Sequence, residues 1–503
     1  MRTKKTLKNM ITSVGLTLIV GILGFIKVRV FVNGLSNDIY SLNQLFYQIF
    51  SYLAITDIGF SLLLNQKLYK AFAKNDHEEI NNIYSTSKKF YNIIGIVIFS
   101  LALIISFFVH IFTKAEVSHF YIQLIFIIFI IRNVVDYFFV APRFVIEADQ
   151  KSYKINFLVK SIKVIETIVE IILVLIGVDY LFILIPGIII TIAIDIIVNK
   201  KIFKEYPWLK NNKTFNRNYL KGTKDMIWRK GADLLNSNTD IILISSFINP
   251  LSVIIYSSYN YITKFLSDII YLVSTAITPS YANVMFKEDN EKKYMVFTEV
   301  YIFFLFIASF ITIMLYGFLS SLIGFWVGEE YIVNNFTLFL FCFILFQVIV
   351  DKATTIIINS QCLFKETKVA TVLEAILNIV ISLSLIHFLG ITGVLLGTII
   401  SRLLTTFIYN AIYIFKNIFK KNPIHYFALY FIVVVTNVLF MFMFNCLNLQ
   451  FTSIFNWIIY VLLFALIVGI VLMLIFLGMF KSFRTLFKRG IEFIKVKGRY
   501  NEI

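Results

Sequence analysis

The sequence predicts an all-α integral membrane protein with about fourteen transmembrane helices. Of its 503 residues, 59% are hydrophobic and only 15% are charged, and the mean hydropathy is +0.83. Fourteen spans of about 22 residues need roughly 300 apolar positions, which is close to the number that the hydrophobic fraction supplies. Almost nothing is left for a domain in water, so a soluble fold is excluded.

Fourteen apolar segments of 20 residues or more follow one another along the chain. They are continuous rather than alternating, and they far exceed the roughly ten residues of a barrel strand. Helices are therefore expected throughout. The segments cover residues 10–31, 40–65, 89–113, 119–141, 155–176, 180–199, 225–248, 251–279, 295–323, 331–358, 369–388, 391–415, 424–446 and 453–479.

Basic residues gather in every second connection between these segments. If the N-terminus is cytoplasmic, the cytoplasmic connections and ends hold 35 of the 46 Lys and Arg residues, against one, Lys114, in the opposite connections. Positive charge marks the cytoplasmic side of a membrane protein, so both termini are predicted to be cytoplasmic. The net charge of +17 thus reflects membrane topology, and no nucleic-acid partner is expected.

The first apolar segment is predicted to be a retained span. It follows a basic start, as a signal peptide does, but it is long and carries Lys27 and Arg29 near its end. No small-residue cleavage pattern follows it, so a signal peptide is not expected.

A long basic connection divides the chain almost in half. From Lys200 to Lys224 it reads KKIFKEYPWLKNNKTFNRNYLKGTK. We expect a lobe of six helices on each side of it, then two extra helices and a basic tail. The predicted limits are 1–202 for the first lobe, 203–224 for the linker, 225–418 for the second lobe, 419–479 for the extra helices and 480–503 for the cytoplasmic tail.

The two halves carry a weak internal repeat. Residues 154–170 align with residues 368–384, and each stretch leads to a turn marked by a glycine, Gly177 or Gly390. Because six helices return the chain to the same face of the membrane, the halves would be parallel copies related by an axis along the membrane normal. Proteins built in this way carry the substrate path between their lobes.

Many charged residues lie inside the predicted spans, where they are costly. An ion at the bilayer centre costs about 2.5–3.5 kcal/mol on insertion scales, so such residues either lie near span ends or face a wet interior. The basic ones are Lys27, Arg29, Arg132, Lys160, Lys163, Arg229, Lys230, Lys264, Lys352 and Arg402. The acidic ones include Asp57, Asp136, Glu166, Glu170, Asp195, Asp233, Asp240, Asp268, Asp351 and Glu374.

Some of these charges can neutralise one another within one helix. Residues three or four apart are neighbours on a helix surface, so a base and an acid at that spacing can pair and fix helix packing. The pairs expected on this basis are Arg132 with Asp136, Lys163 with Glu166, Arg229 with Asp233, and Lys264 with Asp268.

The fifth segment differs because its charges form a stripe. Lys160, Lys163, Glu166 and Glu170 recur at three and four residues on an otherwise apolar helix. Such a stripe needs a hydrated or protein-lined face, and a cavity wall is the interpretation that we favour.

Lys27, Arg29 and Arg402 have no acid three or four residues away. These can accept an anion, although Lys27 and Arg29 lie near a span end, where snorkelling to the membrane surface is the alternative. A guanidinium fork suits a pair of phosphate oxygens, whereas lysine offers a point charge. Arg29 is therefore the first candidate for an anion ligand.

The sequence carries no signature of an enzyme or of a cofactor. There is no GxxxxGK[ST] sequence for ATP hydrolysis and no HExxH cluster among the five histidines. The three cysteines are scattered, which excludes a disulfide framework and paired metal-ligand spacings. The outward connections are too short for a catalytic domain. We expect a protein that is not an enzyme and binds no cofactor or metal.

Several short motifs resemble the polysaccharide transporter branch of the superfamily that also holds multidrug and toxic-compound extruders (MATE). Residues 52–61, YLAITDIGFS, are similar to an acid-aliphatic-glycine turn of this family, with Asp57 and Gly59 in place. Asn238-Thr239-Asp240 stands before an apolar stretch, similar to the family's Asp at that point. The eighth segment closes with Thr278-Pro279-Ser280, like the family's Pro-Ser ending. Residues 389–398, LGITGVLLGT, resemble its paired-glycine turn most closely.

The resemblance implies a MATE-like fold of two six-helix lobes plus two helices. It also implies a flippase of the bacterial plasma membrane that moves an undecaprenyl-pyrophosphate-linked oligosaccharide, such as an O-antigen unit, to the outer leaflet by alternating access. Expected partners are this lipid, membrane lipids, H⁺ or Na⁺, and polysaccharide-assembly proteins. The first segment lacks the proline often found before the family's basic residue.

Candidate site residues follow from the charges and from the resemblance together. The acids Asp57, Asp136 and Glu374 are candidates for ion coupling. The alternatives are a cation-coupled multidrug exporter, in which acids would dominate the cavity, a membrane polysaccharide polymerase or ligase, and a scaffold without transport. The candidate anion ligands are Arg29, Lys27, Arg132, Lys160, Arg229, Lys264 and Arg402.

Overall fold

The structure is a computed structural model of the chain. It describes residues 19–212, 215–216, 219, 223–361, 363–447, 449 and 451–489. Within these ranges, it describes only the backbone of residues 56–59, 61–63, 223–230, 232–234, 237 and 286.

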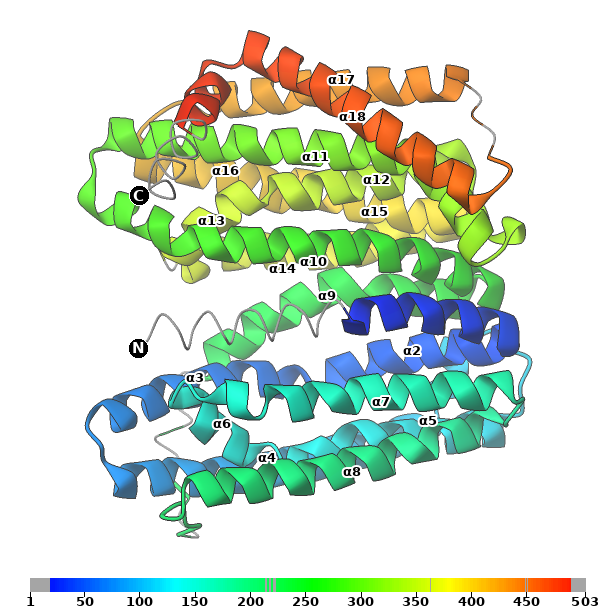
Figure 1. Cartoon of the computed structure of the whole chain (residues 1–503), viewed down its shortest axis with the longest axis vertical. Coiled ribbons are helices and arrows are strands. Elements are labelled where there is room, and N and C mark those ends of the chain that lie inside the picture. The colour runs from blue at the N-terminus through cyan, green and yellow to red at the C-terminus, as the bar shows by residue number, and fades with distance from the viewer. Residues whose placement is uncertain are drawn as a thin grey trace, which may run out of the picture. The chain divides into compact units, whose positions relative to one another are not determined.

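The regular elements of the described residues are all helices (Figure 1), so the predicted all-α fold class is confirmed. Within that part of the chain, nine helices are long and apolar enough to cross a membrane, which makes the protein a multi-pass membrane protein. These nine cover His77–Ser106, His119–Phe138, Tyr180–Glu205, Asn290–Trp326, Asn335–Ser360, Phe364–Leu389, Ile391–Phe419, Ile424–Leu447 and Ile454–Met479.

The other predicted segments also fall on helices, but these helices are interrupted or carry more charge. The described part of the first predicted span, residues 19–31, belongs to a helix over residues 19–34, whereas residues 10–18 of that span lie outside the described residues. The second predicted span breaks at Ala54 into α2 (Asn37–Leu53) and α3 (Ile55–Ala73).

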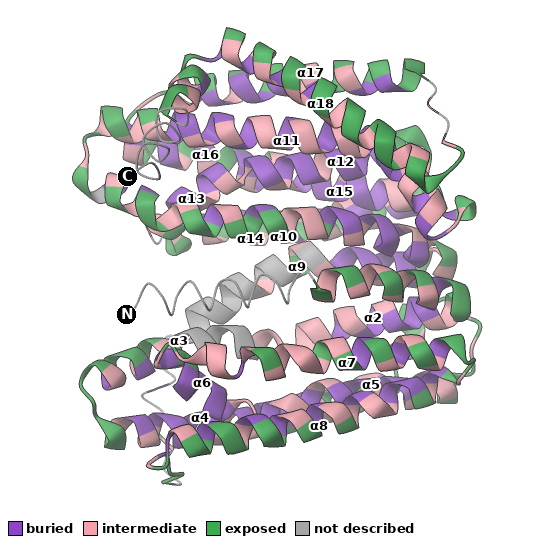
Figure 2. Cartoon of the chain, viewed as in Figure 1, coloured by how far each residue is buried: buried purple, intermediate pink, exposed green. Residues whose placement is uncertain are grey.

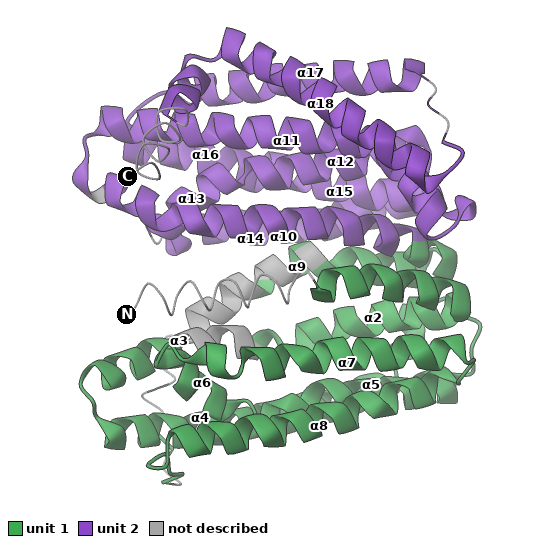
Figure 3. Cartoon of the chain, in the orientation of Figure 1, with its two compact units in different colours: residues 1–254 green, residues 255–503 purple. Residues whose placement is uncertain are grey.

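The chain forms two compact units, residues 1–254 and residues 255–503 (Figure 3). The division falls one helix beyond the predicted linker, because α9 groups with the first unit through its packing against α2 and α3. Besides residues 19–34, α2 and α3, unit 1 contains α4 (His77–Ser106), α5 (His119–Val134), α6 (Ala141–Ala148), α7 (Asn156–Leu175), α8 (Tyr180–Glu205) and α9 (Thr223–Phe247).

Unit 2 contains the remaining helices, with α10 crossing the division near its start. The predicted extra helices, α17 and α18, pack against α11, where the Trp457 indole donates a hydrogen bond to the Phe318 carbonyl (3.2 Å). The helices are α10 (Pro250–Lys287), α11 (Asn290–Trp326), α12 (Asn335–Val350), α13 (Lys352–Ser360), α14 (Phe364–Leu389), α15 (Ile391–Arg402), α16 (Ile408–Ile414), α17 (Ile424–Leu447) and α18 (Ile454–Met479).

Local sequence explains where several helices begin and end. Asp76 caps α4 by accepting a hydrogen bond from the Glu79 N–H (2.9 Å), and Asp289 caps α11 in the same way. The turns predicted at Gly177 and Gly390 are confirmed, since both residues have positive φ (76° and 56°), which favours glycine. By contrast, α10 does not end at Pro279 but continues to Lys287.

Exposed residues lie along the outer faces of many helices (Figure 2), and many of these residues are large and apolar. On α18, Leu462 and Leu466 are 66% and 63% exposed, and on α4 Ile104 is 59% exposed. Exposed aliphatic faces of this extent are unfavourable in water but suit contact with lipid chains.

Helices α14 and α15 approach closely at two glycines one helical turn apart. A Cβ atom at Gly397 would lie 2.2 Å from Ser382 Oγ and 2.9 Å from the Ser382 nitrogen, and one at Gly393 would lie 2.6 Å from the Leu385 carbonyl oxygen. Small residues at this spacing let two helix backbones come together in a membrane.

We therefore predict that Gly397→Ala destabilises unit 2. The added methyl group forces α14 and α15 apart, and overpacking of this kind costs about 1–3 kcal/mol. The measurement is the thermal unfolding midpoint of the purified protein in detergent. Gly478→Ala is the matched control, because no atom lies within 4 Å of a Cβ at Gly478. Equal midpoints for both variants would contradict the prediction.

Candidate functional site

The candidate site of unit 1 begins with the charged stripe of α7. The acids Glu166 and Glu170 are one turn apart and therefore lie on one face of the helix. Both are buried, 6% and 2% exposed, whereas Lys163 on the same helix is exposed. The stripe thus has a buried acidic part and an exposed basic part.

Two bases from other helices pair with these buried acids. Lys27 Nζ lies 2.6 Å from Glu170 Oε2, and Arg132 Nη2 on α5 lies 2.9 Å from Glu166 Oε2. The other guanidinium nitrogen of Arg132, Nη1, contacts Glu170 Oε1. Arg132 therefore bridges both carboxylates, and we call Lys27, Arg132, Lys163, Glu166 and Glu170 the α7 ion cluster.

Helix α8 completes the surroundings of this cluster. Thr191 Oγ1 donates a hydrogen bond to Glu166 Oε1 (2.8 Å), so both oxygens of Glu166 have partners. Gly187 leaves room for the guanidinium group, because a Cβ atom there would lie only 2.5 Å from Arg132 Nε. The small residue is what allows Arg132 to reach between α7 and α8.

The pairing corrects two sequence predictions. Lys27 has no acid nearby in the sequence, yet it is neutralised by Glu170, which is 143 residues away. Arg132 pairs with α7 and not with Asp136, so the predicted Arg132–Asp136 pair is wrong. The reason is that α5 ends at Val134 and continues as a 3₁₀ turn over Val135–Phe138, which changes the direction of Asp136. The predicted Lys163–Glu166 pair is confirmed, at 3.9 Å.

Asp136 belongs to a second group, the Arg143 ion cluster, in which Arg143 and Asp195 are buried and the Asp136 side chain is partly exposed. Arg143 Nη2 lies 2.9 Å from Asp136 Oδ1 and also contacts Asp195 Oδ1 on α8. Asp195 is fully buried, and its Oδ2 has no hydrogen-bond partner among the described residues. Two carboxylates therefore share one guanidinium nitrogen.

In unit 2, Glu374 on α14 pairs with Arg402. The Arg402 Nε lies 3.3 Å from Glu374 Oε1, and Thr406 Oγ1 donates a hydrogen bond to Glu374 Oε2. A π-helical turn over Leu403–Phe407 follows Arg402 and directs both side chains to one carboxylate. The acidic partner of Arg402 thus lies on another helix, so the spacing of charges within its own segment could not predict it.

The remaining predicted site residues are spread over both units. Arg29 is exposed on the helix of residues 19–34, and Lys160 is half-buried on α7. Lys264 and Asp268 are exposed on α10, and no ion pair joins them among the described residues, so that predicted pair is wrong. The side chains of Arg229, Asp233 and Asp57 lie outside the described residues.

Sequence reasoning missed the residues that complete these clusters across helices. Arg143 was placed in a cytoplasmic connection, and neither Thr191 nor Gly187 stood out. The one available signal in the sequence was Asp195, an acid within a predicted span that has no base three or four residues away. An unmatched acid within a span indicates that a partner on another helix must exist.

These charges lie in a known membrane-protein fold. No family model matches the sequence, and no curated protein matches it. The structure is similar to the inward closed conformation of the lipid II flippase MurJ, with a TM-score of 0.68 and 15% identity over 96% of this chain and 99% of that one. It is also similar to an inward-facing multidrug resistance MATE transporter of the MOP superfamily, with a TM-score of 0.63 and 14% identity over 78% of this chain and 94% of that one.

The chain has the MurJ and MATE fold. A MATE transporter of Vibrio cholerae matches with a TM-score of 0.55 and 13% identity over 83% of this chain and 99% of that one. The MATE-like architecture expected from the sequence motifs is therefore confirmed. The MurJ match leaves about 4% of the chain out, roughly 20 of 503 residues, so it must include part of α17 and α18, which together have 50 residues (24 and 26).

We predict that Arg132→Gln destabilises unit 1 strongly. The change leaves Glu166 and Glu170 buried with less positive charge beside them, and breaking a buried ion pair from one side costs about 3–5 kcal/mol. The measurement is the thermal unfolding midpoint in detergent. Lys264→Gln, which removes an exposed base without an ion pair in the described structure, should leave the midpoint nearly unchanged. An Arg132→Gln midpoint equal to that of the control would show that the cluster does not hold the fold.

Proposed function

We propose that this protein is a flippase that moves an undecaprenyl-pyrophosphate-linked oligosaccharide from the cytoplasmic to the outer leaflet of the bacterial plasma membrane. The observation that carries the proposal is the match to the lipid II flippase MurJ over almost the full length of both chains. The ten basic residues within the predicted spans of this sequence support an anionic cargo.

The physical problem for such a protein is the headgroup. A pyrophosphate with a large sugar must cross about 30 Å of hydrocarbon, where an unpaired charge is costly. Basic residues on a hydrated face replace the water around the phosphates, while the lipid tail stays in the membrane. Alternate exposure of that face to the two sides, by movement of the lobes, then transfers the headgroup.

The candidate basic residues differ in exposure. Lys27, Arg132 and Arg402 are buried or half-buried beside acids and serve as supporting residues in this proposal. Arg29 is exposed, and its guanidinium fork suits a phosphate pair. We assign the first phosphate contact to Arg29, with Lys160 and Lys163 of the α7 stripe adding positive charge.

The coupling ion of the proposed transport is H⁺ or Na⁺. Among the candidate acids, Asp136 and Glu374 each contact a guanidinium group, and each lies inside a predicted span. Binding of a cation to either carboxylate competes with its arginine, which is a simple way to connect ion binding with a change in helix contacts. Asp57 remains a candidate from the sequence alone.

A cation-coupled exporter of small molecules is the second candidate. The MATE matches favour it, although they cover 78% and 83% of the chain, whereas the MurJ match covers 96%. Transport of a fluorescent cationic drug by the purified protein, with no movement of lipid-linked sugar, would favour the exporter.

The decisive experiment follows a labelled undecaprenyl-pyrophosphate sugar between leaflets of proteoliposomes. We predict that Arg29→Ala lowers the transfer rate about tenfold or more, because loss of a charge-assisted contact to phosphate costs about 1.5–3 kcal/mol. Arg29→Lys keeps the charge but loses the fork, so it should give an intermediate rate. Arg484→Ala, an exposed arginine outside the predicted spans, is the control.

Two results would contradict these assignments in different ways. An unchanged rate in Arg29→Ala would remove Arg29 from the anion site but leave the flippase proposal standing. No transfer by the unaltered protein, under conditions where it is folded, would reject the flippase proposal itself.

A further inference from the structure

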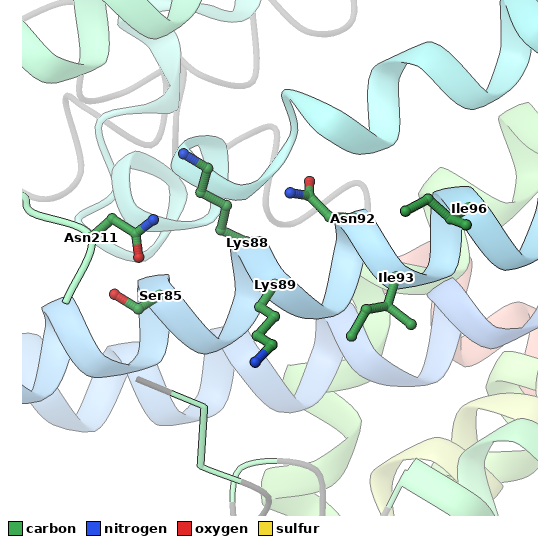
Figure 4. Close-up of a pocket in the computed structure, with 7 residues that line it drawn as sticks. All are labelled: Ser85, Lys88, Lys89, Asn92, Ile93, Ile96 and Asn211. Carbon is green, nitrogen blue, oxygen red and sulfur yellow. The ribbon is translucent and has the colours of Figure 1, made fainter. Parts of the chain in front are cut away.

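A pocket of about 320 Å³ opens on unit 1 (Figure 4), and none of its lining residues belongs to either ion cluster. Six of its seven lining residues come from three turns of α4, and the seventh comes from the segment that follows α8. They are Ser85, Lys88, Lys89, Asn92, Ile93, Ile96 and Asn211.

Hydrogen bonds hold the segment after α8 against α4 and so form the wall of the pocket. The Asn212 N–H donates to Ser85 Oγ (2.8 Å), and the Lys210 N–H donates to Asn81 Oδ1 (2.8 Å). Asn211 lies between these two fixed residues. One backbone hydrogen bond on each side of Asn211 therefore sets its position at the rim of the pocket.

The polar end of the pocket is basic and contains no carboxylate. Figure 4 shows the side chains of Lys88, Asn92 and Asn211 on the same side of α4, whereas Lys89 turns to the other side. No ion pair involves Lys88 or Lys89 among the described residues, and the Lys89 ammonium lies 5.2 Å from the centre of the Phe215 ring. An ammonium group with two amide groups beside it offers N–H donors to an anion.

The other end of the pocket is apolar and continues along α4. Ile93 and Ile96 are 45% and 57% exposed, and the exposed face continues through Val97, Leu101 and Ile104 at helical spacing. Helix α4 has 30 residues and is therefore about 45 Å long, which exceeds the 30 Å hydrocarbon layer. The pocket lies where its polar first part meets its apolar part.

We propose that this pocket binds the phosphate headgroup of an anionic phospholipid, with an acyl chain along the exposed face of α4. Basic residues followed by an aliphatic face match a ligand that has a phosphate at one end and a hydrocarbon chain at the other. Lysines near a membrane surface attract anionic lipids, and the predicted topology places this end of α4 in the cytoplasmic leaflet, where such lipids gather. Lys88 makes the principal contact, and Lys89 adds to the positive field.

The bound lipid touches both α4 and Asn211. Its occupancy therefore adds to the hydrogen bonds from Asn212 and Lys210 that hold Asn211 beside α4. This role is separate from the proposed cargo site, since the pocket shares no residue with the Arg29 and α7 groups.

The test is binding of fluorescent phosphatidylglycerol to the full chain in nonionic detergent, with phosphatidylcholine as the neutral comparison. We expect phosphatidylglycerol to bind more tightly. Lys88→Ala should weaken it about fivefold, and the double variant Lys88→Ala/Lys89→Ala about thirtyfold, because each lysine contributes about 1 kcal/mol near an anionic surface. The matched control is Lys200→Ala/Lys201→Ala, which removes two exposed lysines at the end of α8.

A second variant and a competitor distinguish a lipid headgroup from free inorganic phosphate as the bound group. Ile96→Asn should weaken phosphatidylglycerol binding, because the acyl chain loses part of its apolar face. Inorganic phosphate should compete poorly. Equal affinity for the two lipids, equal losses in the Lys88/Lys89 and Lys200/Lys201 variants, or full competition by inorganic phosphate would each overturn the proposal. Unchanged circular dichroism of each variant ensures that a loss of binding is not a loss of fold.

Discussion

Charges buried at hydrocarbon depth require partners, and this requirement organises unit 1 of the protein. Arg132 contacts both carboxylates of α7 and lies against Gly187 of α8, so one guanidinium group connects α5, α7 and α8. Lys27 then connects residues 19–34 to the same cluster through Glu170. Removing any one partner would leave a charge that neither water nor lipid stabilises.

The same principle operates in unit 2 with different residues. Glu374 on α14 receives Arg402 and Thr406 from the next helix, and one turn further along α14 the Asn378 side chain donates a hydrogen bond to Thr398 (3.1 Å). In each unit, the helix before a glycine turn carries a buried glutamate that contacts the following helix: Glu166 of α7 contacts α8, and Glu374 of α14 contacts α15. The buried acids do not occupy equivalent positions of the weak repeat, because Glu374 aligns with Lys160; the two units share only the placement of an acid on the helix before a glycine turn.

The helices were predictable from the sequence, whereas most of the site was not. Hydropathy locates the fourteen segments because burial in lipid imposes long apolar runs, and the turns at Gly177 and Gly390 follow from the freedom of glycine to adopt positive φ. Helical spacing also gave the Lys163–Glu166 pair. It could not give Lys27 with Glu170, or Arg143 with Asp195, because those partners meet through the packing of separate helices. The 3₁₀ turn that begins at Val135 shows how a local change of helix type redirects a side chain, because a regular α-helix would place Asp136 beside Arg132.

The π-helical turn of Leu403–Phe407 has a consequence for how unit 2 can rearrange. Such a turn holds one residue more than an ordinary α-helical turn, and each residue of an α-helix corresponds to about 100° of rotation. If that residue were taken up elsewhere in the helix, the side chains of Ile408–Ile414 would swing by about this angle around the axis while the backbone stayed helical. A bilayer tolerates this kind of register exchange, because it exposes no peptide group to hydrocarbon.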